Sequence, residues 1–207
     1  MAPTTETKAQ IVNLVREFVR RDVAPVAQEL DREDRVPHDL IDQMKEMGLF
    51  GLTVPEEHGG AGLDTSQYAQ VVYTMAYAAP AYRSIFSINV GMFNSALKNG
   101  GTPEQQAEWW PRIAGGEIAC FGLTEPGSGS DSAAMQTTAK PDPDGNGWIL
   151  NGTKRYITNA PHADVALIMA RTEKEALPKN AHVSAFLVPM DTPGVSTGSP
   201  DKKMGQA

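Results

Sequence analysis

The stretch Gly115-Gly116-Glu117-Ile118-Ala119-Cys120-Phe121 divides the sequence into two parts with different periodicities. Before it, apolar residues recur at the three- and four-residue spacing that is typical of amphipathic helices. From Ile118 onward, β-branched and aromatic residues come in short runs separated by Gly, Pro, Asn and Asp, which is typical of strands and turns. The sequence therefore predicts an α+β protein, with an all-α N-terminal domain over residues 1–116 and a β-domain over residues 117–207.

Local signals mark the ends of several helices in the first part. Asp64, Thr65 and Ser66 are candidate N-caps of one helix, and Thr102 with Gln105 has the spacing of a capping box at the start of another. Pro25 is expected to disturb the first helix, because proline has no backbone N–H to donate. A later helix over residues 81–98 is apolar nearly all round, which predicts that it is buried.

The second part is predicted to form an antiparallel sheet. Strands are expected around residues 165–171 and 183–189. Asn151-Gly152 lies between the apolar runs 148–150 and 156–158, and an Asn-Gly pair readily adopts the positive φ angles of a type I′ turn. These runs are therefore expected to form a β-hairpin, and the domain is expected to be a barrel or a sandwich.

Composition and charge narrow the classes of function. The 207 residues are 41% hydrophobic and 21% charged, as is usual for a globular protein, and their formal net charge is -7. Charges of both signs are interspersed, so no basic surface for nucleic acid is expected. The N-terminus does not have the pattern of a signal peptide, and the longest apolar stretch is too short to span a bilayer. We therefore expect a cytoplasmic protein without a membrane partner.

Signals for a nucleophile or a metal site are weak. Cys120 is the single cysteine, and its apolar neighbours favour a buried structural side chain over a catalytic thiol. The histidines are scattered without the spacing of metal ligands, and no Gly-x-Ser-x-Gly motif is present. Neither a metal centre nor a catalytic triad is predicted.

The strongest candidate for a binding site is Leu123-Thr124-Glu125-Pro126-Gly127-Ser128-Gly129-Ser130-Asp131. Its glycines and hydroxyls can expose backbone N–H groups to an anionic phosphate. No Gly-Lys-Ser/Thr follows, and the glycine spacing is not that of a dinucleotide-binding turn, so neither of these phosphate motifs is present. From composition alone, a phosphate-binding loop and a plain structural turn both remain open.

The same stretch resembles the Thr-Glu-Pro-Gly-x-Gly-Ser-Asp signature of the acyl-CoA dehydrogenases. The resemblance covers essentially the whole chain, because it extends to Pro55-Glu56-x-x-Gly59-Gly60-x-Gly62, Asn151-Gly152-x-Lys154, Tyr156-Ile157-Thr158-Asn159 and Met204-Gly205-Gln206. It implies a helical N-terminal domain and a middle β-domain. The C-terminal four-helix domain of the family is expected to be absent, since the sequence ends within the β-domain.

The resemblance also implies an FAD site. Carried over residue by residue, the cofactor-binding residues are Phe121, Leu123, Thr124, Gly129, Ser130, Tyr156, Ile157 and Thr158. Ser130 is also expected to touch the acyl-CoA substrate. Tyr156, where many members have Trp, is expected to place its ring against the flavin, and the Thr158 hydroxyl to lie near N5, the atom that receives the hydride.

The implied reaction is the α,β-dehydrogenation of an acyl-CoA thioester to a trans-2-enoyl-CoA, as in fatty acid β-oxidation. The general base of the family is a glutamate of the C-terminal domain, so no catalytic residue is expected here and Glu125 is interpreted as structural. The 207 residues alone are expected to be inactive and to bind FAD weakly.

The full-length protein is expected to be a homotetramer that passes electrons to an electron-transfer flavoprotein. Three alternatives remain open from the sequence. They are an acyl-CoA oxidase, a flavin-dependent desulfinase, and a non-catalytic protein that binds flavin or CoA or serves as an oligomerisation partner.

Overall fold

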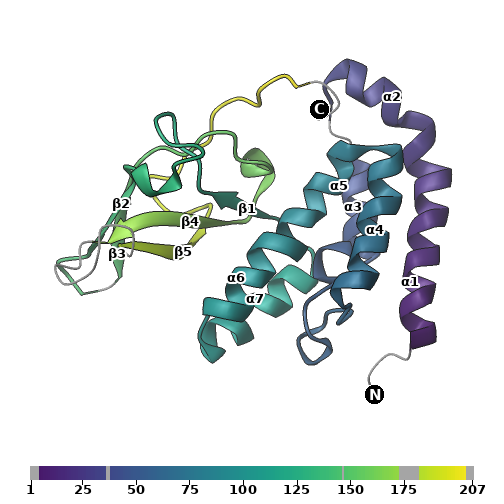
Figure 1. Cartoon of the computed structure of the whole chain (residues 1–207), viewed down its shortest axis with the longest axis horizontal. Helices are drawn as coiled ribbons and strands as arrows, with labels where there is room; N and C mark the ends of the chain where they lie inside the picture. Colours follow the sequence, from purple (N-terminus) through teal and green to yellow (C-terminus); the bar gives the residue numbers. More distant parts are fainter. Residues whose placement is uncertain (1–4, 36–37, 146, 173–181, 204–207) are drawn as a thin grey trace. The chain divides into compact units, whose positions relative to one another are not determined.

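The computed structural model describes residues 5–35, 38–145, 147–172 and 182–203 (Figure 1). Contacts between Cα atoms group the chain into two compact units. One unit runs to Ile118 and takes in the segment that begins at Ser199, and the other is Ala119–Gly198. The domain bounds drawn from the sequence, 1–116 and 117–207, stay a prediction, and the motif at residues 204–206 lies outside the described residues.

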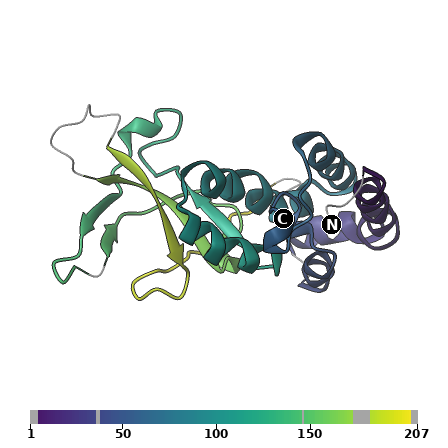
Figure 2. The ribbon, with the colours of Figure 1, turned by 90° about the horizontal axis from the view of Figure 1, so that it is seen from below.

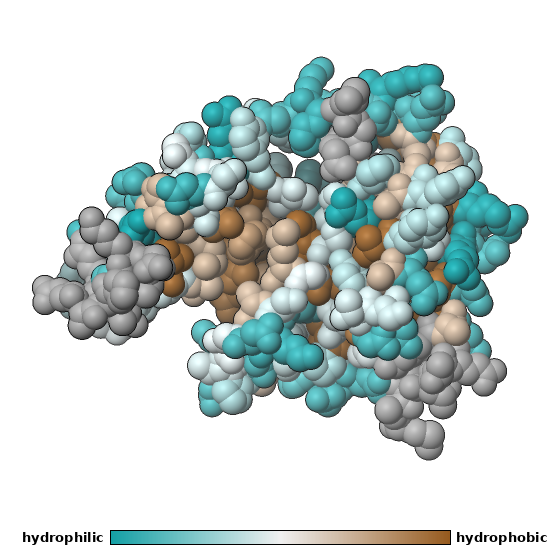
Figure 3. All heavy atoms as spheres, viewed as in Figure 1, coloured by the Kyte–Doolittle hydropathy of each residue, from teal (hydrophilic) through white to brown (hydrophobic). Residues whose placement is uncertain are grey.

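The first unit is helical. Its helices are α1 (Thr5–Phe18), α2 (Ala24–Glu33), α3 (His38–Glu46), α4 (Thr65–Ala78), α5 (Pro80–Ser87), α6 (Asn94–Gly100) and α7 (Pro103–Ala114) (Figure 1). Val15, Met44 and Phe86 are among the side chains that are fully buried in its core. Arg16 and Glu17 of α1 are exposed, and the side of the molecule on which α1 lies is largely hydrophilic in Figure 3.

Two π-helical turns interrupt the helices of this unit. Val19–Val23 joins α1 to α2 just before Pro25, and a wider turn accommodates a residue that cannot donate to the preceding turn. Ile88–Phe93 joins α5 to α6, so the single helix predicted over residues 81–98 is divided into segments. Its predicted burial is confirmed in part, since Phe86 and Phe93 are fully buried but Met92 is 49% exposed.

Reciprocal side-chain caps begin α4 and α7. The Gln67 N–H donates to Asp64 Oδ1 at 2.9 Å, and the Asp64 N–H donates to Gln67 Oε1 at 3.1 Å. Thr102 and Gln105 form the same arrangement at the start of α7. The capping box predicted at Thr102 is confirmed, and Asp64 is the N-cap among the three candidates at residues 64–66. The two caps fix where these helices begin.

The second unit is built on a mixed sheet. Its strands are β1 (Ala119–Gly122), β2 (Thr138–Pro141), β3 (Trp148–Asn151), β4 (Val165–Thr172) and β5 (Val183–Pro189) (Figures 1 and 2). β4 pairs in parallel with β1 and β2 and antiparallel with β5, while β3 pairs antiparallel with β2.

The prediction of an antiparallel barrel or sandwich is therefore wrong for the described residues. Two of the pairings are parallel, and the sheet is not closed. The chain between β1 and β4 returns to the same end of the sheet, so that the two strands run in the same direction. Turn signals in the sequence are local and do not report such a return.

The hairpin of this unit is β2–β3. These strands pair from Thr138↔Asn151 to Pro141↔Trp148, and the turn between them contains glycines with positive φ, Gly145 at 74° and Gly147 at 143°. Residues 156–158 form no strand. The hairpin predicted around Asn151-Gly152, and the strand predicted over 156–158, are both wrong.

Gly152 lies at a close approach of two backbone segments and not in a turn. Neither Asn151 nor Gly152 has a positive φ. A Cβ atom at Gly152 would lie 2.3 Å from Thr137 Oγ1 and 2.7 Å from Thr137 Cα. Because Gly152 has no side chain, the residue after β3 can lie close against Thr137, the residue before β2. This close approach brings the following residues toward the loop after β1.

Candidate functional site

The loop that follows β1, residues 123–131, is closed by its own hydrogen bonds; we call it the β1 loop. The Glu125 N–H donates to the Ser128 carbonyl at 2.9 Å, and the Ser128 N–H donates to the Glu125 carbonyl at 3.2 Å. The Ser128 hydroxyl donates to the Asp131 carbonyl at 2.8 Å. Gly129 and Ser130 are exposed beyond this tight turn.

Residues 154–158, which we call the Tyr156 segment, lie against the β1 loop. The Arg155 N–H donates to the Thr124 carbonyl at 2.8 Å, and the Lys154 ammonium donates to the Leu123 carbonyl at 3.2 Å. Leu123 and Lys154 are 31 positions apart in the sequence. The two stretches from which the flavin residues were predicted are thus in direct contact within one unit.

Tyr156 has an unusual backbone conformation for a residue with a large side chain. Its φ is 59°, in the left-handed region, and 66% of the residue is exposed. The guanidinium carbon of Arg155 lies 4.6 Å from the centre of the Tyr156 ring. Such backbone strain costs about 1–3 kcal/mol and is concentrated at functional sites. The strain and the exposed ring together make Tyr156 a candidate ligand contact.

Three hydroxyls of the predicted site are available to a ligand. In the described part of the chain, the hydroxyls of Thr124, Ser130 and Thr158 have no protein hydrogen-bond partner. Thr124 is half-buried, while Ser130 and Thr158 are exposed. The remaining predicted side chains, those of Phe121, Leu123 and Ile157, are half-buried and apolar.

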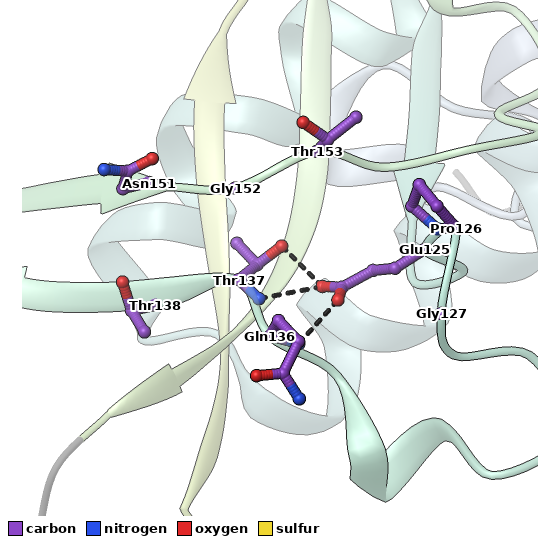
Figure 4. Close-up of a pocket in the computed structure, with 9 residues that line it drawn as sticks. All are labelled: Glu125, Pro126, Gly127, Gln136, Thr137, Thr138, Asn151, Gly152 and Thr153. Atoms are coloured by element: carbon purple, nitrogen blue, oxygen red, sulfur yellow. Dashed lines mark hydrogen bonds between the residues drawn. The ribbon is translucent and has the colours of Figure 1, made fainter.

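Glu125 is buried, and its carboxylate oxygens are occupied. Oε1 accepts hydrogen bonds from the Thr137 N–H at 3.0 Å, from the Thr137 hydroxyl and from the Lys154 ammonium at 2.7 Å. Oε2 accepts one from the Gln136 N–H at 2.5 Å (Figure 4). Burial alone would raise the pKa of Glu125, but these hydrogen bonds outweigh burial and lower its pKa to about 2. The group is an ionised structural acid.

Arg171, on β4, fixes the far end of the same region. Its Nε donates to the Met135 carbonyl at 2.7 Å, and the guanidinium also donates to the Ala133 carbonyl. The Arg171 N–H donates to the Thr137 carbonyl at 2.8 Å. The chain between the β1 loop and β2 is therefore held by side-chain and backbone donors of the central strand.

Sequence reasoning did not identify the partners of Glu125. Lys154 was noted only as part of a motif, and Thr137 and Gln136 were given no role. The sequence feature that indicates such partners is Glu125 itself, because a carboxylate next to a buried strand requires hydrogen-bond donors. Choosing Lys154 over the nearby Arg155 requires the position of the strand ends, which the sequence does not supply.

A cavity of about 430 Å³ adjoins the turn at Glu125 (Figure 4). It is lined by residues 125–127, 136–138 and 151–153. None of the residues predicted to bind the cofactor lines this cavity. Thr124, Ser130 and Thr158, which have the free hydroxyls described above, do not line it. The Glu125 carboxylate oxygens at this cavity are already hydrogen-bonded.

Other candidate chemistry is limited in the described residues. Cys120 is buried, and burial raises its pKa to about 11. No group of His, Cys, Asp and Glu among the described residues is arranged to hold a metal ion. Of the helices that the structure describes, none has the length and apolar character needed to cross a membrane.

Known proteins provide a comparison for the whole chain. The chain is 38% identical over 201 residues to the mitochondrial short-chain specific acyl-CoA dehydrogenase of Bos taurus, covering 97% of this chain and 48% of that protein. It spans about half the length of the curated relatives it matches.

Solved structures agree with this similarity. A chain from the structure of the electron transferring flavoprotein of Acidaminococcus fermentans superposes with a TM-score of 0.89 at 35% identity, covering 99% of this chain and 53% of that one. A glutaryl-CoA dehydrogenase of Mycobacterium smegmatis in complex with FADH2 has a TM-score of 0.83 at 33% identity, covering 98% and 50%.

Sequence models of domain families match both parts of the chain. Residues 5–117 match the acyl-CoA dehydrogenase N-terminal domain, and residues 120–207 match the acyl-CoA dehydrogenase middle domain. These two matches leave almost none of the sequence uncovered, and the chain belongs to the acyl-CoA dehydrogenase family.

Proposed function

We propose that this chain supplies one wall of the FAD and acyl-thioester site of an FAD-dependent acyl-CoA dehydrogenase. The observation that carries the proposal is the contact between the β1 loop and the Tyr156 segment. This contact puts the free hydroxyl of Thr124 and the exposed ring of Tyr156 on adjoining stretches of backbone. Family membership supports the choice of ligand, since solved relatives hold FAD or FADH2.

The residues present suit a flavin. An isoalloxazine ring needs apolar or aromatic surface against its face and polar groups along its edge. Tyr156 supplies an exposed ring, Leu123 and Ile157 supply apolar surface, and the hydroxyls of Thr124 and Thr158 have no competing protein partner. The same segments therefore offer both kinds of contact.

The exposed end of the β1 loop suits a more polar part of the ligands. Nothing lies within 4 Å of the position that a Cβ atom of Gly129 would occupy, so a ligand can approach the backbone there. Ser130 is exposed beside it and is proposed to contact both the cofactor and the acyl-CoA.

Bound FAD would supply the hydride acceptor, and the chain's residues would position it. We assign the Thr158 hydroxyl to the flavin edge near N5 and the Tyr156 ring to the flavin face. The proton next to the thioester carbonyl needs a carboxylate base whose pKa lies near the working pH. Glu125 does not meet this requirement, because its pKa is about 2 and its oxygens are occupied. The base is therefore proposed to come from the family's C-terminal helical domain.

The remaining features of the full protein are proposed from its family. They are an acyl-CoA substrate, a trans-2-enoyl-CoA product, an electron-transfer flavoprotein as electron acceptor and a homotetrameric assembly. The 38% identity to a short-chain specific enzyme makes short acyl-CoA thioesters the first substrates to test.

An anaerobic titration tests the proposal. FAD is added to the purified chain and binding is followed by the quenching of flavin fluorescence, and butyryl-CoA is then added while the visible flavin absorbance is recorded. We expect weak FAD binding and no bleaching, because none of these 207 residues is assigned as the base. Absence of any FAD binding would contradict the proposed flavin contacts, and rapid bleaching would show that a residue of this chain acts as the base.

The alternative reactions are separated with a polypeptide that has the full length of its relatives, because the 207 residues alone are expected to be inactive. An oxidase would consume oxygen when acyl-CoA is supplied in air, whereas a dehydrogenase requires an added electron acceptor. A module that only binds flavin or CoA would show neither reaction when the polypeptide has the full length of its relatives.

A further inference from the structure

We propose that Lys154 is a positioning residue for the cofactor, and that its ammonium sets the FAD affinity of the chain by fixing the β1 loop. The inference rests on the proposed flavin site. Lys154 is not assigned any contact with the flavin itself. It would act through the backbone on either side of Thr124.

The Lys154 ammonium contacts the two residues on either side of Thr124. Its Nζ donates to the Leu123 carbonyl at 3.2 Å and to Glu125 Oε1 at 2.7 Å. The Thr124 carbonyl accepts the neighbouring Arg155 N–H at 2.8 Å. Three consecutive residues of the loop are thus tied to two consecutive residues of the Tyr156 segment, and the Thr124 hydroxyl is left free.

The ion pair between Lys154 and Glu125 is shielded from water, so the loss of either hydrogen bond from the Lys154 ammonium is costly. The Lys154 and Glu125 side chains are only 9% and 4% exposed. In such surroundings a charge-assisted hydrogen bond is stronger than at the surface, and a carbonyl that loses its partner is not readily rescued by solvent. Removing the ammonium is expected to release Leu123 while the backbone donors of Gln136 and Thr137 still hold Glu125.

Space for the lysine stem is built into β1. A Cβ atom at Gly122 would lie 3.1 Å from Lys154 Cγ and 2.6 Å from Ile168 Cδ1. The glycine at the end of β1 therefore lets the stem pass between the strand end and β4 to reach the loop. This route explains how a residue far along the chain reaches the backbone beside Thr124.

A purely structural ion pair is the competing explanation, and a matched pair of variants separates the two. Lys154→Met and Thr137→Val each remove one hydrogen bond to Glu125 Oε1. Only Lys154→Met also frees the Leu123 carbonyl. Lys140→Met, an exposed lysine on β2 of the same sheet, controls for the loss of a positive charge.

FAD affinity is measured by fluorescence quenching for each folded variant. Lys154→Met is expected to raise the Kd for FAD by about tenfold or more, which corresponds to about 1.4 kcal/mol, because charge-assisted hydrogen bonds are among the stronger ones in proteins. Thr137→Val and Lys140→Met are expected to leave the Kd unchanged. An equal rise in Lys154→Met and Thr137→Val, or no rise in Lys154→Met, would overturn the proposal. Should Lys154→Met not fold, Lys154→Gln replaces it, with a smaller rise expected and an unchanged Kd as the contrary result.

Hydrogen exchange without FAD keeps this test separate from the flavin assignment. Lys154→Met is expected to speed exchange of the amides in residues 123–130 more than Thr137→Val does, while β4 and β5 stay unchanged. If the unaltered chain binds no FAD, the proposed function fails, yet this exchange difference still decides whether Lys154 orders the loop. Equal exchange in the two variants would show that it does not.

Discussion

Tyr156 combines a strained backbone with an exposed ring, and two substitutions separate these properties. Tyr156→Asn is expected to change the free energy of unfolding by less than about 0.5 kcal/mol, because the ring is exposed and asparagine tolerates positive φ. Tyr156→Val is expected to destabilise by about 1–2 kcal/mol, because a β-branched residue does not. Both should weaken FAD binding by a similar factor in a fluorescence titration, since both remove the ring. Unchanged binding in both would exclude a flavin contact.

Glu125 gives the stability of the chain a specific dependence on acid. Its pKa is lowered from 4.5 to about 2 in the folded chain, so the unfolded chain takes up a proton at higher pH than the folded one. Its stabilisation is therefore complete above about pH 4.5 and is lost as the pH falls toward about 2, and it amounts to about 3 kcal/mol.

Urea unfolding at pH 6 and pH 3 measures this contribution. Glu125→Gln is expected to be less stable than the unaltered chain at pH 6, with the difference shrinking at pH 3, because the amide carries no charge to lose. An equal difference at both pH values would mean that the Glu125 carboxylate is not held in its ionised form by its neighbours.

At the scale of the elements, a substitution at Gly152 tests the observed close approach to Thr137 against the turn that the sequence predicted at Asn151-Gly152. Gly152→Ala is expected to destabilise the chain by about 1–3 kcal/mol, because its Cβ would meet the Thr137 backbone and hydroxyl. Gly127→Ala is the control, since nothing lies within 4 Å of its Cβ and its φ is not positive. Urea midpoints measure both. Equal effects of the two changes would contradict the close approach at Gly152.

Helix ends could be predicted because their chemistry is local. Asp64 with Gln67, and Thr102 with Gln105, each place donor and acceptor three positions apart, so the sequence alone contains both partners. Sheet order is not local in this sense. The parallel pairing of Ala119 with Val165 depends on the whole path between them. The Asn151-Gly152 pair has the sequence signature of a turn, but in the structure it marks a close contact.

In the candidate site too, features within one stretch of sequence can be predicted, whereas contacts between distant residues cannot. The hydroxyls and glycines of the β1 loop were recognisable in one continuous stretch, and a second motif pointed to the Tyr156 segment. The Glu125–Lys154 pair could not be found, because the cation that reaches a buried carboxylate is selected by the packing at Gly122 and Gly152. The candidate binding groups are thus easier to identify from the sequence than the residues proposed to position them.

At the scale of the whole molecule, the formal net charge of -7 acts on every anionic ligand. Within the β1 loop and the Tyr156 segment, Lys154 and Arg155 carry two positive charges, and Glu125 and Asp131 carry two negative ones. These segments therefore have no net charge, so they are not expected to oppose the repulsion between the acidic chain and the pyrophosphate of FAD. Salt screens this repulsion, because the Debye length falls to about 10 Å at 0.1 M ionic strength.

FAD is accordingly expected to associate faster as salt is raised, by about twofold between low salt and 0.2 M, in stopped-flow quenching of its fluorescence. Riboflavin shares the ring but lacks the phosphates, so its association rate should not depend on salt. A decrease for FAD alone would mean that a cation of the site, with Arg155 the first to substitute, attracts the pyrophosphate more strongly than the whole chain repels it.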